Sequence, residues 1–300
     1  MLFYNMKKIT VFTTTYNRAY LLPRLYESLQ KQTNKNFIWL IIDDGSTDNT
    51  REIVLDWMAK SEIVIQYHYK ENGGMHTGHN LAYKIIETEL NVCVDSDDFM
   101  PEDAVQIILE TWQAIEDKDN TSGIVGLNVD ESGNVIGLKI PKKLERGSYF
   151  DLYEKGKAIG DKKFVLNTKL VKKQSMYPEF PGEKLVPLGT LYIKMGEENP
   201  FVFVNKVFCI VDYQIDGSSH TIFKQYAQSP RGFAYARKSN NRFIIDATAR
   251  FKNAVHIGSA ALFAKDWRII IENKRTIINL LVFPLSIILN IYIRIKIKSN

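Results

Sequence analysis

The first half of the chain alternates between short apolar runs and segments whose apolar residues recur at helical spacing. Phe37–Ile42 is a continuous apolar run, typical of a parallel strand that is covered on both faces. Leu22, Leu25 and Leu29 share one face of a helix. The predicted strands are Lys8–Thr15, Phe37–Ile42, Ile63–Tyr69 and Asn91–Val94, and the predicted helices cover 21–32, the region around Ile53–Met58, Thr77–Glu89 and the segment after Pro101. Repeated strand–helix pairs predict an α/β fold with a mostly parallel sheet flanked by helices.

The second half of the chain has a less regular pattern. Gly123–Leu138 is typical of two strands joined by a turn over residues 130–134. Further strands are predicted at Phe164–Leu166 and Phe201–Val211, and a helix over Arg242–Phe263. We therefore expect a C-terminal helical region over residues 226–300, whose tail begins at about residue 267.

This tail carries an apolar segment from Ile277 to Ile293 that is interrupted by Asn279, Pro284, Ser286 and Asn290. Seventeen residues with a central proline are at the short end for a bilayer span. Basic residues flank the segment at positions 274, 275, 294, 296 and 298. This pattern favours a segment that lies at, or dips into, an anionic cytoplasmic leaflet. The alternative is a C-terminal helix pair packed on the main domain.

Composition narrows the class of protein only slightly. With 45% hydrophobic and 24% charged residues, the chain is typical of a globular protein. The net charge of +5 lacks the clustered basic face of a nucleic-acid binder, so we expect no nucleic-acid partner. Cys93 and Cys209 lie in apolar runs and resemble small hydrophobic residues, which fits a reducing compartment. The N-terminal residues show no secretory signal.

The sequence Asp95-Ser96-Asp97-Asp98 follows a predicted buried strand directly. Carboxylates crowded at a strand end repel one another, and a divalent cation that carries phosphates would offset this repulsion. Their hard oxygen atoms favour Mg²⁺ or Mn²⁺. The alternative is a solvated acidic turn before the helix that begins near Pro101. The chain contains no GxxxxGK[ST] motif, which excludes a P-loop nucleotide hydrolase.

Polar residues follow three of the predicted strands, at 13–18, 43–48 and 95–98. In parallel sheets, ligands bind at these carboxyl ends. The succession TTTYNR, SLQKQT, LIIDDGSTDNT, NGG and VDSDDFMPED resembles the family 2 glycosyltransferases of the GT-A (Rossmann-like) fold over roughly the first 110 residues. The resemblance implies a nucleotide-sugar donor, with a UDP-sugar as the expected one.

The resemblance places the nucleotide at the first two strand ends. Thr14 and Tyr16 are expected to border the uracil and ribose, and Asp44 to accept a hydrogen bond from the base. The alternative for the Asp43-Asp44 pair is a plain turn into the next helix. One of the two aspartates is expected to serve only that turn.

The family's Asp-x-Asp element corresponds to Asp95, Ser96 and Asp97, with Asp98 adjacent. The resemblance implies that Asp95 and Ser96 contact the nucleotide, while Asp97 or Asp98 holds Mn²⁺ or Mg²⁺. The bound cation would neutralise charge on the departing diphosphate.

The segment Asn72–Asn80 follows the third predicted strand. Its glycines let the backbone approach a phosphate, so Asn72 and Gly73 are expected at the diphosphate. Many relatives carry Arg-Asn where this chain has His79-Asn80. Two roles therefore stay open for His76 and His79: a structural role at the helix start, or contact with a phosphate.

Inverting transfer needs a base for the acceptor hydroxyl. The family places a carboxylate at a helix start, and the best match is Glu183, followed by Lys184 where relatives commonly have Asp. The alternative for Glu183 is a helix-dipole role in a first turn. Asp212 and Asp216 are the other candidates. Residues 213–220 resemble the family's flexible loop over the diphosphate, on which His220 or Arg231 could close.

The sequence thus predicts a catalytic domain over residues 1–225, with a nucleotide-binding half (about 1–125) and an acceptor half (about 126–225), followed by the C-terminal helical region. The expected activity is inverting, metal-dependent glycosyl transfer to a cell-surface polysaccharide or lipid-linked glycan, at the cytoplasmic face of the cell membrane. The alternative is a non-catalytic sugar-nucleotide-binding or membrane-bound scaffold of the same fold.

Overall fold

The computed structural model describes residues 7–212, 221–241, 246–271 and 276–299. The chain forms two compact units. The sheet unit comprises Met1–Met176 and Tyr192–Gln214, and the helical unit comprises Tyr177–Leu191 and Ile215–Asn300. The predicted functional halves, and the predicted boundary after residue 225, stay predictions.

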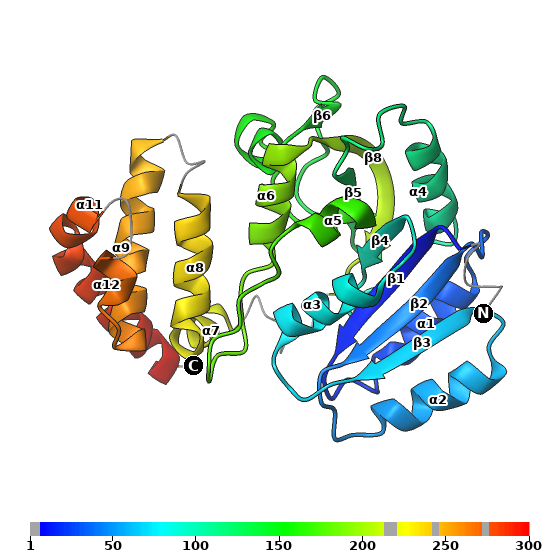
Figure 1. The fold of residues 1–300 in the computed structure, drawn as a ribbon, viewed down its shortest axis with the longest axis horizontal. Helices are drawn as coiled ribbons and strands as arrows, with labels where there is room; N and C mark the ends of the chain where they lie inside the picture. Colours follow the sequence, from blue (N-terminus) through cyan, green and yellow to red (C-terminus); the bar gives the residue numbers. More distant parts are fainter. Residues whose placement is uncertain (1–6, 213–220, 242–245, 272–275, 300) are drawn as a thin grey trace. The chain divides into compact units, whose positions relative to one another are not determined.

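The sheet unit is built on one mixed sheet (Figure 1), which has eight strands within the described residues, in the order β3-β2-β1-β4-β7-β5-β8-β6. Strands β3, β2, β1 and β4 run parallel to one another, and β7 runs antiparallel to both β4 and β5. The strands are β1 (Ile9–Thr15), β2 (Phe37–Asp43), β3 (Val64–Tyr69), β4 (Leu90–Cys93), β5 (Gly123–Val129), β6 (Arg146–Gly147), β7 (Lys162–Asn167) and β8 (Phe201–Ile210). The predicted mostly parallel α/β sheet is confirmed.

Helices cover both faces of the parallel strands. Their bounds are α1 (Leu22–Gln30), α2 (Thr50–Lys60), α3 (Met75–Ile85), α4 (Ala104–Gln113), α5 (Thr168–Lys173) and α6 (Gly189–Glu198). One face, which includes Val11 and Trp39, packs in a core with α1, α2 and α4. On the other face Phe12 meets the rings of His79 and Tyr83 from α3 edge-on. Alternate residues of each strand thus serve opposite layers, which fixes the register of the sheet.

Two of the sequence-based predictions are wrong in detail. The second strand of the predicted hairpin does not form, and only an isolated bridge joins Val129 to Val135. No helix begins at Glu183, because residues 183–187 are irregular and α6 begins at Gly189. Pro187 explains the late start, since a proline restricts the residue before it to extended backbone and is tolerated only near the beginning of a helix.

The helical unit contains six helices among its described residues, arranged around α9. They are α7 (Ile222–Gln228), α8 (Pro230–Asn240), α9 (Ala247–Ala264), α10 (Arg268–Ile271), α11 (Thr276–Leu281) and α12 (Phe283–Ser299). Tyr226, Ala234, Ile257 and Ile293 bring α7, α8, α9 and α12 into one core. Of the helices described, none combines the length and the hydropathy needed to cross a bilayer.

Candidate nucleotide and metal site

The loops that follow β1 and β2 are tied together through Asn17. Its backbone lies in the left-handed region, with φ of 52°. The Asn17 N–H donates to Ser46 Oγ at 2.9 Å, and its Oδ1 accepts from the Thr47 N–H at 2.7 Å. The polar ends of the first two strands therefore form one local structure, as expected for neighbouring parallel strands.

Asp43 and Asp44 have different tasks. The Ser46 N–H donates to Asp43 Oδ1 at 2.8 Å, so Asp43 holds the turn after β2. The buried carboxylate of Asp44 instead accepts from the backbone N–H groups of Gly73 and Gly74, at 2.9 and 2.7 Å. Lys70 Nζ lies 2.5 Å from Asp44 Oδ1. Asp44 thus joins the end of β2 to the glycine-containing segment between β3 and α3.

This segment also approaches β1 and β2 closely. A Cβ atom added to Gly45, which has φ of +88°, would lie 2.8 Å from the Asn72 nitrogen. A Cβ on Gly78 would lie 2.7 Å from Thr14 Cγ2. Only glycine fits such close approaches between backbone and neighbour. Thr14 Oγ1 is buried and has no hydrogen-bond partner among the described residues, whereas the Tyr16 side chain is half exposed.

The acidic sequence after β4 contacts the loop after β1. Arg18 Nη1 lies 3.0 Å from Asp97 Oδ2 and 3.5 Å from Ser96 Oγ. Burial raises the pKa of Asp97, the charge of Asp95 raises it further, and Arg18 opposes both effects. Asp95 and Asp97 are therefore close enough to repel each other, and Arg18 is the cation that faces Asp97.

Asp98 points into the protein. Its carboxylate is buried, with Lys163 Nζ at 3.5 Å and the Cys209 thiol at 3.6 Å. Burial raises the pKa of Asp98 to about 7; Lys163 opposes this shift, while Asp95 and Asp97 add to it. The pKa of the buried Lys163 is raised, because nearby acidic groups outweigh its desolvation. Asp97 and Asp98 are thus neutralised by different cations.

Within the described residues, no three His, Cys, Asp or Glu side chains converge as a ready metal site. The donor chemistry nevertheless fits a hard divalent cation, since carboxylate oxygens dominate this strand end. The charge of Asp95 adds to burial in raising the pKa of Asp97, so a cation between these two carboxylates would relieve their repulsion. Asp97 and Asp95 are the residues that would hold such a cation, because the Asp98 carboxylate points inward to Lys163 and the Cys209 thiol.

His79 belongs to the core. Its ring is fully buried, Nδ1 lies 3.1 Å from the Tyr83 hydroxyl, and burial lowers its pKa to about 4. A neutral, enclosed imidazole is a poor phosphate ligand, so the geometry favours the structural alternative for His79.

Glu183 lies in the helical unit and meets the N-terminus of α8. Its Oε1 accepts from the Arg231 N–H at 3.1 Å, and its Oε2 accepts from the Gly232 N–H at 2.9 Å. The guanidinium of Arg231 lies 3.4 Å from Oε1. Glu183 therefore satisfies free N–H groups at the beginning of α8, a helix distant in sequence. The helix-dipole alternative had expected Glu183 to do this in the first turn of its own helix.

The other candidates for the base are placed differently. Asp212 forms an ion pair with Arg24 at 2.8 Å. Asp216 and His220 lie outside the described residues. Arg231 contacts Glu183, as described above, and its position over a diphosphate stays a prediction.

Sequence reasoning missed three basic residues at the site, namely Arg18, Lys70 and Lys163. Arg18 ends the quoted TTTYNR and Lys70 directly follows the predicted strand Ile63–Tyr69, so their positions were a usable signal, although neither was assigned a role. Lys163 lies within β7, where a lysine beside Phe164 and Val165 offers no sequence sign that it faces an aspartate from another strand.

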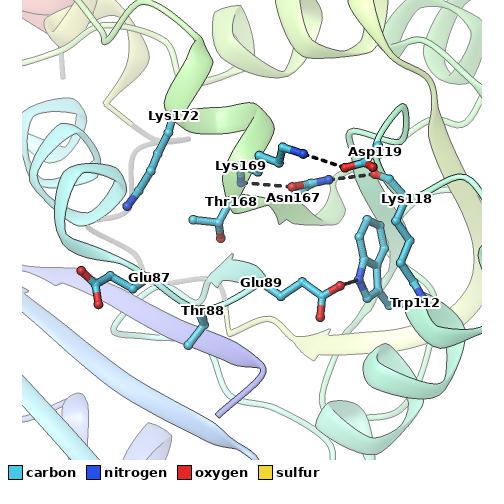
Figure 2. Close-up of a pocket in the computed structure, with 10 residues that line it drawn as sticks. All are labelled: Glu87, Thr88, Glu89, Trp112, Lys118, Asp119, Asn167, Thr168, Lys169 and Lys172. Carbon is cyan, nitrogen blue, oxygen red and sulfur yellow. Dashed lines mark hydrogen bonds and ion pairs between the residues drawn. The ribbon is translucent and has the colours of Figure 1, made fainter. Parts of the chain in front are cut away.

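A separate pocket of about 270 Å³ lies at the opposite edge of the sheet, near the beginning of β4 and the end of β7 (Figure 2). Its walls include an exposed ion pair between Lys169 and Asp119 at 2.8 Å. Trp112 Nε1 donates to Glu89 at 2.7 Å. None of the predicted site residues lines this pocket.

Comparison with known proteins agrees with this geometry. Residues 10–167 match the model of glycosyl transferase family 2. Glycosyltransferase GlyG of Streptococcus pneumoniae is 32% identical over 126 residues, which are 41% of this chain and 40% of that protein. An uncharacterized glycosyltransferase of Rickettsia felis is 37% identical over 103 residues, which are 34% of this chain and 17% of that protein. The matched regions thus span less than half of these relatives.

Solved structures show the same fold. S. aureus TarS 1-349 in complex with UDP-GlcNAc superposes with a TM-score of 0.60 at 17% identity, covering 97% of this chain and 92% of that chain. A mannosyltransferase from Pyrobaculum calidifontis, in complex with GDP-Man and Mn²⁺, gives a TM-score of 0.56 at 15% identity, covering 95% and 87%. The predicted GT-A fold is confirmed.

Proposed function

Because the chain belongs to glycosyl transferase family 2, we propose that it transfers a sugar from a nucleotide sugar to a hydroxyl group. The observation that carries the proposal is the joining of four strand ends at one edge of the sheet. Asn17 and Ser46 link β1 to β2, Asp44 and Gly73 link β2 to the segment after β3, and an ion pair links the loops after β1 and β4.

The donor is a UDP-sugar in this proposal. Thr14 and Tyr16 would border the nucleoside. Asp44 would accept a hydrogen bond from the base. Asn72 and Gly73 would lie at the diphosphate, with Asp95 and Ser96 on the nucleotide side of the acidic sequence. A crystal structure of TarS, which shares the fold, is in complex with UDP-GlcNAc. This supports uridine as the nucleoside of the donor.

A divalent cation, Mn²⁺ or Mg²⁺, is proposed at Asp97 with Asp95 beside it. When bound there, the ion would neutralise the charge that develops on the departing diphosphate. The Pyrobaculum mannosyltransferase, of the same fold, contains Mn²⁺ with its nucleotide sugar. Asp98, the other predicted ligand, would support this site indirectly, by holding Lys163 through their ion pair.

Glu183 is the proposed base. In direct displacement, the acceptor hydroxyl gives its proton to this carboxylate as its oxygen bonds to the anomeric carbon. The bond from that carbon to the diphosphate oxygen breaks, so the configuration inverts. The N–H groups of Arg231 and Gly232 would hold the Glu183 carboxylate in one orientation during this step.

The proposed acceptor is a cell-surface polysaccharide or a lipid-linked glycan. The proposed place of action is the inner face of the cell membrane, which the C-terminal tail would contact. Its basic residues Arg294, Lys296 and Lys298 are exposed on α12 and suit an anionic leaflet.

Calorimetric titration with UDP, with and without Mn²⁺, tests the donor site. Wild-type protein is expected to bind UDP more tightly when Mn²⁺ is present. Asp97→Ala should abolish this difference, and Asp98→Ala should reduce it by releasing Lys163. Asp119→Ala, an exposed aspartate at the far edge of the sheet, is the matched control. Unchanged UDP affinity in both site variants would contradict the assignment.

A further inference from the structure

The C-terminal helix α12 exposes its apolar residues. Leu285, Ile288, Ile291 and Ile295 recur at spacings of three and four, so they share one face of the helix. Ile288 is 63% exposed and Ile295 is 61% exposed. A helix that covers a protein in water turns polar residues outward, whereas α12 is apolar on its outer face as well as toward the core.

The buried face of α12 mixes polar and apolar residues, since Ser286 and Asn290 lie beside Ile293, which belongs to the core of the helical unit. Ser286 and Asn290 are buried against α9. A Cβ added to Gly258 of α9 would lie 2.3 Å from Ser286 Oγ, so the two helices touch at a glycine. The Asn290 side-chain amide donates to the Ser259 carbonyl at 3.3 Å. Small residues and polar side chains between helices are typical of packing in lipid.

Helix α11 also buries an asparagine and exposes apolar residues. Asn279 is fully buried, and its amide donates to the Ile270 carbonyl at 3.3 Å. Ile277 and Leu281 are 75% and 76% exposed. Two successive helices therefore hide their asparagines and present isoleucine and leucine outward. Together, these exposed residues of α11 and α12 form the apolar tail face: Ile277, Ile278, Leu280, Leu281, Leu285, Ile287, Ile288, Ile291, Tyr292 and Ile295.

Basic residues adjoin this face. Arg294, Lys296 and Lys298 are exposed on the last turns of α12, the helix that carries part of this face. An anionic lipid surface would neutralise these charges, whereas α11 and α12 contain no acidic residue with which the same helices of a second copy could pair them. The charge thus distinguishes lipid from self-association as the occupant of the apolar face.

We propose that the apolar tail face inserts into the acyl boundary of an anionic bilayer, with the basic residues at the headgroups. Insertion deepens the proposed membrane contact and does not depend on which sugar is transferred. It predicts a hydrophobic attachment that persists in high salt, where interactions between exposed charges are screened within about 3 Å.

Flotation of the full-length protein with vesicles tests the insertion. One set of vesicles contains phosphatidylcholine alone, and the other also contains the anionic lipid phosphatidylglycerol. Wild-type protein is expected to float with the anionic vesicles and to remain bound in about 1 M NaCl. Ile288→Asn should lower the ratio of bound to free protein by about tenfold or more. The matched control is Ile159→Asn, which makes the same change at an isoleucine that is 64% exposed in the sheet unit; it should bind as wild type.

Three outcomes would overturn the proposal: release of the protein by high salt, equal binding of Ile288→Asn and wild type, or a lipid-free dimer that Ile288→Asn dissociates. Circular dichroism of Ile288→Asn should match wild type, since the side chain is exposed. Calorimetry with UDP on the same variant keeps the donor site separate. If the wild-type protein binds UDP but does not float with the vesicles, the insertion proposal is refuted and the donor-site proposal is not.

Discussion

The ion pair between Asp98 and Lys163 lies behind the acidic sequence, where both side chains are largely buried. Replacing Lys163 by Met removes the cation that faces Asp98 and keeps a long, unbranched side chain. Asp98 then lies among apolar groups and the two other carboxylates that already raise its pKa. The structure therefore predicts a loss of stability that depends on the charge of Asp98.

Removing one partner of a buried ion pair is destabilising because it leaves a buried charge alone. At pH 8, about one unit above its pKa, Asp98 can be protonated for about 1.4 kcal/mol, so we expect Lys163→Met to lose about this much unfolding free energy through Asp98. The pKa of folded Asp98 is raised above its ordinary value, to about 7. A raised acid pKa makes the folded state more stable at low pH, and this contribution is lost as the pH rises toward and past 7. At pH 5 protonated Asp98 needs no cation, so the loss in Lys163→Met should be much smaller.

Urea unfolding at pH 5 and pH 8 measures both quantities. Asp98→Asn should cost less than Lys163→Met, because Asp95 also faces Lys163. The double variant should recover about 1 kcal/mol at pH 8 relative to Lys163→Met, since the buried charge of Asp98 is no longer left alone. Lys169→Met, at an exposed ion pair, is the control and should change little. Strictly additive losses, or a larger loss at pH 5 than at pH 8, would refute the reasoning.

Three further predictions concern the sheet unit. Wild-type protein should lose about 3 kcal/mol of stability through His79 as the pH falls from 6.5 to 4, because burial lowers its pKa to about 4; urea unfolding should show this loss abolished in His79→Leu and retained when exposed His68 is changed to Gln. Gly78→Ala should cost about 1–3 kcal/mol by thermal unfolding, because the new methyl meets Thr14 Cγ2. Thr14→Ser should restore much of that loss, and failure to do so would count against the contact. Asp44→Asn should weaken UDP binding in calorimetry even at saturating Mn²⁺, since two backbone N–H groups and Lys70 lose part of their carboxylate; wild-type affinity would contradict its role.

The regular half of the fold was predictable from sequence because its central strands β1 and β2 are buried along their whole length. Such strands are continuous apolar runs, and Phe37–Asp43 formed where Phe37–Ile42 was predicted. The hairpin after β5 failed because alternation around Val135 does not specify a partner strand, and β7 and β8 pair with β5 instead. Glu183 was expected to begin a helix, and Pro187 delays that helix to Gly189.

At the site, sequence reasoning found the acidic residues and missed the cations that neutralise them. Motif spacing led us to propose Asp44, which follows β2 directly, and Asp97, which lies in the acidic sequence soon after β4. It could not separate Asp97 from Asp98, since adjacent residues differ only in which way their side chains point. Lys163 is 65 positions beyond Asp98 in the sequence, and only the antiparallel pairing of β7 with β4 brings it near.

We propose that the protein transfers a sugar from a UDP-sugar with Glu183 as base. The most direct measurement is UDP release from a panel of UDP-sugars, with Mn²⁺ and a mixture of lipid-linked glycans as acceptor. We expect one UDP-sugar to support saturable release, reduced about 100-fold or more in Glu183→Gln and unchanged when exposed Glu179 is changed to Gln. Release that no UDP-sugar raises above the protein-free rate, or full activity in Glu183→Gln, would contradict the claim.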